Sequence, residues 1–292
     1  MTILVTGATG RIGSQVIERL AQSGASVRAL TRTPEKAHLP AGVTAVAGDL
    51  LDVDSARAAL QGVSTMFLLA PNVADELTQA LTALNLARDA GVRGIVYLSV
   101  FKGEAYSDVP HFTGKHAVER MIADAKLPAT VLRPAYFMQN DVMQREALLG
   151  AGIYGSPIGS VGLAMVDTRD IADAAAAELL RRERSPAPLG PEAYDLVGPE
   201  NLTGPGLASL WAEVLGREVR HGEDDLDATE QRLRGFAPGW LAYELRLMMR
   251  RYQENGAVAT SDEVERMTRL LGHPPRPYRD FAAETARAWR GA

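Results

Sequence analysis

Three glycines at fixed spacing near the N-terminus constrain the fold more than any other feature of the chain. Gly7, Gly10 and Gly13 follow the apolar run at residues 3–5, and apolar residues then recur at helical spacing. Glycines in this pattern let a strand turn tightly, let the backbone approach a pyrophosphate, and let the next helix pack closely on a sheet. The N-terminus of that helix offers backbone N–H groups and the positive end of its dipole to phosphate. The sequence therefore predicts a strand, a phosphate-binding turn and a helix.

The first half of the chain alternates short apolar runs with longer amphipathic ones. We expect strands at 3–5, 27–30, 44–47, 66–69, 95–98 and 129–132, and helices from 12, at 55–61, at 75–90 and at 110–125. This alternation is typical of right-handed βαβ crossovers and of a parallel sheet covered on both faces. The predicted fold class is α/β, a Rossmann-type doubly wound parallel sheet, with the strand order left open.

After Pro134 the pattern changes to a smaller, mostly helical C-terminal cap. The glycine-rich stretch 150–162 predicts a loop, 170–182 a helix and 193–197 one more strand of the sheet. Helices are then expected at 203–216, 226–253 and 261–271. We assign 1–135 plus 166–198 to the dinucleotide-binding domain, and 136–165 plus 199–292 to the cap that would hold the substrate.

Composition excludes several classes of protein. The 292 residues carry a net charge of -5 and no cysteine, which argues against a nucleic-acid partner and excludes disulfides and thiolate metal sites. No metal-ligand spacing is visible, and no apolar run reaches the roughly 18 residues of a membrane span. The chain begins directly with a strand, so we expect no signal peptide and a cytoplasmic location. Only four of the 31 basic residues are lysines, which favours a bacterial source. A monomer or a homodimer with a small-molecule substrate is expected.

The end of the second strand indicates which dinucleotide is bound. An NAD site usually has an acidic residue there, but residues 27–33 contain none, and Arg32 occupies its place. A guanidinium can bind a 2′-phosphate in bidentate fashion, so the sequence predicts NADP(H), with Arg11 and Lys36 assisting. The alternative is that Arg32 is a solvated loop arginine. Thr9 and Ile12 complete the predicted phosphate loop with Arg11 and the three glycines.

With these residues in place, the chain resembles the NmrA-like branch of the atypical short-chain dehydrogenases/reductases. The resemblance covers most of the chain. Its motifs are Thr6 to Gly13, Gly48-Asp49-Leu50, Leu69-Ala70-Pro71, Tyr97-Leu98-Ser99, His111 to Lys115 with Glu119, Leu132-Arg133-Pro134 and Val166 to Ala172. It implies a sheet of the dinucleotide-binding order with its site at the carboxyl ends of the strands.

The resemblance also implies roles for particular residues. Asp49 and Leu50 would border the adenine, and Lys115 would contact the nicotinamide ribose. The path to the nicotinamide would be lined by Leu69-Ala70-Pro71. The nicotinamide end would be covered by Pro134 to Phe137, a segment that includes Tyr136.

A departure from the family pattern concerns the proton donor. Reductases of this superfamily use serine, tyrosine and lysine, with tyrosine four residues before lysine and so one helical turn away. Ser99 and Lys115 match, but the tyrosine position holds His111. Imidazole can donate or relay a proton at neutral pH. His111 is therefore either the proton donor or a helix-end residue that is hydrogen-bonded locally. Ser99 is either a site residue or a hydrogen-bond donor that ends its strand. The candidate substitute acids are Tyr136 and Tyr106.

Two functions remain open on the sequence. The first is an NADPH-dependent reductase that transfers hydride to a small apolar carbonyl, quinone or conjugated substrate. The second is a non-catalytic NADP(H)-binding redox sensor, because the same family contains regulators and the usual acid is missing. Nothing in the sequence specifically supports a third option, an isomerase or epimerase with tightly held NADP.

Overall fold

The computed structural model describes residues 1–291, and the chain forms two compact units. The first comprises Met1–Gly103, Thr113–Arg133 and Thr168–Asp195, and the second comprises the intervening segments and the chain from Leu196 onward. The chain passes from one unit to the other after residues 133, 167 and 195, whereas the sequence-based division placed these boundaries after residues 135, 165 and 198. The second unit also takes Glu104–Phe112, which the sequence-based division left in the first domain. The cause is a set of contacts with the C-terminal part, such as Asp108 with Arg250 and Arg251.

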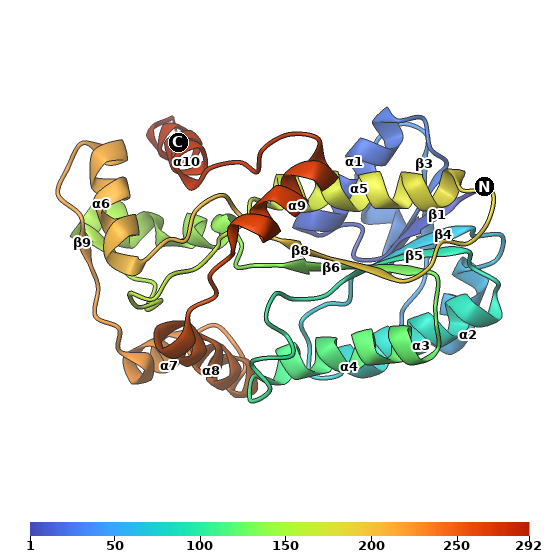
Figure 1. The fold of residues 1–292 in the computed structure, drawn as a ribbon, viewed down its shortest axis with the longest axis horizontal. Helices are drawn as coiled ribbons and strands as arrows, with labels where there is room; N and C mark the ends of the chain where they lie inside the picture. The colour runs from blue at the N-terminus through green and yellow to red at the C-terminus, as the bar shows by residue number, and fades with distance from the viewer. Residues whose placement is uncertain (292) are drawn as a thin grey trace. The chain divides into compact units, whose positions relative to one another are not determined.

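The first unit is built on a seven-stranded sheet of order β3-β2-β1-β4-β5-β6-β8 (Figure 1). The strands are β1 (Ile3–Val5), β2 (Val27–Thr31), β3 (Val43–Ala47), β4 (Thr65–Leu68), β5 (Gly94–Leu98), β6 (Ala129–Pro134) and β8 (Glu192–Leu196). All five neighbouring pairs from β3 through β6 are parallel. The order reverses between β1 and β4, which confirms the doubly wound class and supplies the strand order that periodicity left open.

Helices cover both faces of this sheet. They are α1 (Arg11–Gln22), α2 (Val53–Ala59), α3 (Glu76–Asp89), α4 (Pro110–Asp124) and α5 (Thr168–Arg184), with a short 3₁₀ turn, η1 (Pro34–Lys36), after β2. In Figure 1, α1 and α5 lie on one face, and α2, α3 and α4 lie on the other. Strand β5 is buried along its whole length, as expected for a central parallel strand with helices on both sides.

The second unit is mostly helical, as predicted. Its elements are the 3₁₀ segment η2 (Met138–Gln144), the π-helical turn η3 (Ala147–Ala151), the paired strands β7 (Ile153–Tyr154) and β9 (Arg220–His221), and the helices α6 (Gly204–Leu215), α7 (Leu226–Leu233), α8 (Gly239–Asn255), α9 (Ser261–Leu271) and α10 (Tyr278–Arg290). No helix within residues 1–291 is both long and apolar enough to cross a membrane.

Two expectations for this unit were wrong. The helix predicted over 226–253 is broken into α7 and α8, because Pro238 takes an extended conformation immediately before Gly239. The stretch 150–162, expected to be only loop, contributes the end of η3 and the strand β7. Helix α10 was not anticipated at all.

A buried carboxyl group joins several elements of the second unit. Asp141 on η2 is fully buried, and its Oδ2 accepts hydrogen bonds from the hydroxyls of Tyr278 at 2.6 Å and Tyr154 at 2.9 Å. The indole of Trp211 donates to the Tyr278 hydroxyl at 3.0 Å. Burial raises the pKa of Asp141 to about 6, although the tyrosine hydrogen bonds act in the opposite direction.

Candidate functional site

The glycine loop follows β1, and its geometry requires glycine at two positions. Gly7 has φ +61°, in the left-handed region that L side chains rarely adopt, and a Cβ there would lie 3.0 Å from Leu69. A Cβ at Gly13 would lie 2.1 Å from the carbonyl oxygen of Gly7, closer than any tolerated contact. The loop and the first turn of α1 are therefore packed backbone to backbone, as a pyrophosphate-binding turn requires.

The N-terminus of α1 is suited to an anion. Its cap residue is Gly10, which makes no side-chain hydrogen bond to the helix, and its first turn contains no acidic residue. Gly7, Thr9, Gly10 and Arg11 are exposed, whereas Ile12 is buried and anchors the helix on the sheet. The first-turn amides thus have no capping side chain as acceptor, and the helix dipole presents positive charge at the same place.

The segment after β4 lies beside this loop, at the point where the strand order reverses. The hydroxyl of Thr6 donates to the Leu69 carbonyl at 3.0 Å, and the Leu69 amide donates to the same hydroxyl oxygen at 2.8 Å. Ala70 is buried and Pro71 is exposed. The predicted segments after β1 and β4 are therefore brought together, at the place where ligands bind in open α/β sheets.

The end of β2 presents a basic side chain. Arg32 directly follows β2 and is exposed, and its side chain makes no hydrogen bond or ion pair with any of residues 1–291. Lys36, on η1, is exposed as well. Nearby on the chain, the Asp49 carboxylate accepts a hydrogen bond from the Leu51 amide at 2.9 Å, while Leu50 is buried.

Two ion pairs surround the carboxyl end of β5. The ammonium of Lys115 lies 2.6 Å from a carboxylate oxygen of Glu76 and 3.4 Å from the Leu98 carbonyl. Ser99 is buried, and its hydroxyl donates to Glu119 at 2.5 Å, while Arg133 pairs with the same carboxylate at 2.6 Å. Ser99 and Lys115 thus occupy the expected positions but already have carboxylate partners.

The two carboxylate partners of Ser99 and Lys115, Glu119 and Glu76, differ in whether the sequence identifies them. Glu119 is part of the family motif. Glu76 was missed: it lies in the first turn of α3, the helix that follows Leu69-Ala70-Pro71, and nothing in that position marks it as the partner of Lys115. Burial, with the negative charges of Glu76 and Glu119 adding to it, raises the pKa of Tyr97 well above its usual value. Tyr97 therefore stays protonated at neutral pH.

In the second unit, His111 and Tyr136 have different surroundings. The His111 ring contacts the Glu244 carboxylate through Nδ1, and the His111 amide donates to the same oxygen at 2.6 Å. Tyr136 is part-buried and packs edge-on against Tyr252, with ring centroids 6.0 Å apart. Burial and the nearby Asp141 charge raise the pKa of Tyr136. Glu244 could not be identified from the sequence, because it lies 133 residues away from its partner.

The other predicted residues of this unit have structural contacts. Phe137 bridges to Val166, and the backbone carbonyl of Tyr136 accepts the Val166 amide at 2.9 Å. Pro134 is the last residue of β6. Tyr106 is buried, and its hydroxyl donates to the Gly256 carbonyl, which accounts for this tyrosine as a packing residue.

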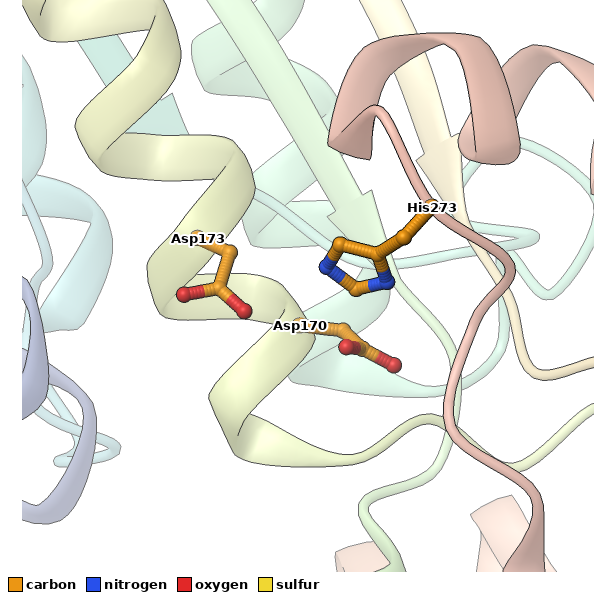
Figure 2. A group of neighbouring side chains, drawn as sticks. All are labelled: Asp170, Asp173 and His273. Carbon is orange, nitrogen blue, oxygen red and sulfur yellow. The ribbon is translucent and has the colours of Figure 1, made fainter.

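One carboxylate on α5 has a structural partner in the same unit. Figure 2 shows Asp170 and Asp173 projecting from α5 near its start; the third side chain drawn, His273, belongs to the second unit. Asp173 forms an ion pair with Arg19 of α1. Because α1 and α5 lie against each other, this pair stabilises the helical layer on that face of the sheet.

Comparison with known proteins places the chain in a family. The model of the NmrA-like family matches residues 1–271. The chain belongs to the NmrA-like family. It is 34% identical to a (4-alkanoyl-5-oxo-2,5-dihydrofuran-3-yl)methyl phosphate reductase of Streptomyces griseus, covering 98% of this chain and 99% of the relative. It is 31% identical to an NAD(P)H azoreductase of Xenophilus azovorans, covering 99% and 100%.

Solved structures of this NmrA-like chain's relatives share its fold. One is an NADPH-dependent quinone oxidoreductase of Escherichia coli complexed with NADPH, with a TM-score of 0.85 and 26% identity. The match covers 97% of this chain and 99% of that one. The likeness therefore extends over both units and is not limited to the glycine loop.

Proposed function

We propose that the chain is an NADPH-dependent reductase that transfers hydride to a small apolar carbonyl, quinone or conjugated acceptor. The observation that carries the proposal is the glycine loop at the strand-order reversal, where Gly13 can carry no side chain and α1 has no capping side chain. Two relatives above 30% identity over nearly the whole chain are reductases by name, which supports catalysis.

The residues present fit a phosphorylated dinucleotide. Thr9 to Gly13 would hold the pyrophosphate on the exposed backbone of α1's first turn. Arg32 would bind the 2′-phosphate, since it is exposed, has no partner of its own within the described chain, and has no acid beside it at the end of β2. Arg11 and Lys36 would add positive charge around the same phosphate groups.

The remaining cofactor contacts follow the path along the strand ends. Asp49 and Leu50 would border the adenine, and Leu69-Ala70-Pro71 would line the route to the nicotinamide. Ser99 and Lys115 would lie at the nicotinamide ribose, where Lys115 would exchange part of its interaction with Glu76 for a ribose hydroxyl. Pro134, Tyr136 and Phe137 would cover the nicotinamide end. The bound cofactor would supply the hydride, and the protein would orient the acceptor and supply a proton.

His111 is the proposed proton donor. It occupies the position one helical turn before Lys115 on α4, and its side chain retains 12% exposure. Tyr136 is the second candidate, because it is part-exposed, although its raised pKa makes its hydroxyl a weaker acid than that of an ordinary tyrosine. A quinone or conjugated acceptor stabilises its own developing negative charge, so it depends less on a strong acid than a simple ketone does.

The alternative function is a non-catalytic NADP(H) sensor. It shares the cofactor-binding residues and differs only in lacking turnover. We favour the reductase because the relatives above 30% identity are reductases by name and because Lys115 and Ser99 are retained.

Stopped-flow measurement of NADPH oxidation against a panel of quinones, azo dyes and conjugated carbonyl compounds tests the proposal. The reductase predicts saturable oxidation with at least one acceptor class. Tight NADPH binding without oxidation by any of them would contradict the reductase and favour the sensor.

A further inference from the structure

Two donors of His111 converge on one carboxylate oxygen. The backbone amide of His111 donates to Oε1 of Glu244 at 2.6 Å, and Nδ1 of the ring contacts the same oxygen. His111 lies in the first turn of α4 and Glu244 lies on α8, both within the second unit. This contact connects a residue of the proposed chemistry to a residue that nothing in the sequence singles out.

The burial of Glu244 makes this contact strong. Its side chain is only 4% exposed, and within residues 1–291 its hydrogen-bond partners both belong to His111. A buried carboxylate is stable only when donors satisfy it. Glu244 is therefore held in place by His111, and it holds His111 in return.

The contact also determines which ring nitrogen carries the proton. An ionised carboxylate only accepts hydrogen bonds, so the nitrogen that faces it, Nδ1, must be the donor. In the neutral ring Nε2 then has no hydrogen, and in the protonated ring it carries one. Nε2 has no hydrogen-bond partner among the described residues, and the edge of Phe112 packs on the ring with centroids 4.7 Å apart.

We propose that Glu244 is a positioning residue: it fixes the Nδ1–H form of His111 and stabilises the protonated ring, so that Nε2–H delivers the proton of the reduction. This role rests on the proposed reductase function. When the acceptor takes up hydride from the reduced nicotinamide, the Nε2–H bond breaks and a new O–H or N–H bond forms on the acceptor. The electron pair stays on Nε2, and solvent returns the proton after turnover.

A purely structural role for Glu244 would be to cap the N-terminus of α4. The Glu244→Gln variant separates the two roles, because the amide oxygen of glutamine can still accept both N–H groups but cannot stabilise a positively charged ring. Glu254→Gln makes the same chemical change at an exposed position of α8 and serves as the matched control.

The test combines nitrogen-15 NMR of the histidine rings with steady-state kinetics. In the wild-type chain at high pH, we expect the His111 signal to show a protonated Nδ1 and a bare Nε2. In Glu244→Gln, we expect kcat with a quinone to fall by about 10- to 100-fold, with the Kd for NADPH unchanged. Glu254→Gln should keep wild-type values for both.

The outcomes separate the two claims. An Nε2–H tautomer in the wild-type chain would overturn the role of Glu244 without any variant being needed. Wild-type kcat in Glu244→Gln, in a chain that reduces quinones, would overturn it as well. If His111 has the expected tautomer but none of the acceptors oxidises the bound NADPH, that result would instead overturn the proposed reductase function on which the role rests.

Discussion

At the residue scale, the choice between the two nicotinamide cofactors depends on Arg32. Replacing it by alanine removes the charge-assisted hydrogen bonds proposed for the 2′-phosphate, which are worth about 1.5–3 kcal/mol. We expect Arg32→Ala to weaken NADPH binding by about 10- to 100-fold and to leave NADH binding nearly unchanged, as measured by fluorescence titration. Arg57→Ala, at an exposed position on α2, is the control. Equal losses for both cofactors would refute the assignment.

Gly13 provides a second residue-level test. A methyl group there would meet the Gly7 carbonyl oxygen at 2.1 Å, so the loop would have to move. We expect Gly13→Ala to abolish cofactor binding and to lower the free energy of unfolding by about 1–3 kcal/mol, measured by urea denaturation. Gly190→Ala, where a Cβ meets nothing within 4 Å, should change neither quantity. Retained NADPH affinity in Gly13→Ala would contradict the loop's proposed role.

Individual residues also mark the limit of prediction from the sequence. The glycine spacing and the position of Arg32 are local signals, so strand, turn and helix could be predicted around them. The carboxylates that pair with Lys115 and His111 depend on contacts across the fold, and their positions in the sequence carry no comparable signal. Glu76 and Glu244 were missed for that reason.

At the element scale, helix ends decide where prediction succeeds. Asp52 caps α2 through its side chain, which accepts hydrogen bonds from the amides of Asp54 and Ser55. The break between α7 and α8 was missed, because helical periodicity continues on both sides of the short connection 234–238, which ends in Pro238. The proline and glycine in that segment were the available signal.

Helix α9 offers a prediction at this scale. Thr260 and Glu263 form a reciprocal capping box at its start. Thr260→Ala removes the side-chain acceptor for the Glu263 amide, so we expect the free energy of unfolding to fall by about 1 kcal/mol. Thr268→Ala, within the same helix, is a matched control for the loss of a threonine hydroxyl. A capping-box variant no less stable than this control would contradict the role of the cap.

At the scale of the whole molecule, Asp141 links pH to stability. Its pKa of about 6 in the folded chain exceeds the ordinary value of 3.8, mainly because the group is buried. The folded state therefore binds the proton more tightly than the unfolded state does. The resulting stabilisation is fully present below the ordinary pKa and is lost as pH rises through about 6.

The rise in the pKa of Asp141 on folding corresponds to about 3 kcal/mol in the free energy of unfolding. We expect wild-type stability, relative to Asp141→Asn, to fall by roughly that amount between about pH 4 and pH 7, measured by urea denaturation at each pH. Taking the difference between the wild-type chain and the variant removes the contribution of every other titrating group to the pH dependence of stability. A difference that stays constant with pH, or that grows as pH rises, would contradict the account.

The central claim is that this chain binds NADPH and uses it. The most direct test is to mix the NADPH-loaded protein with excess quinone in a stopped-flow instrument and follow the absorbance of the reduced nicotinamide. We predict a rapid loss of that absorbance whose rate saturates with quinone concentration and is slowed in Glu244→Gln. Bound NADPH that stays reduced in the presence of quinone, azo and conjugated carbonyl acceptors would contradict the account.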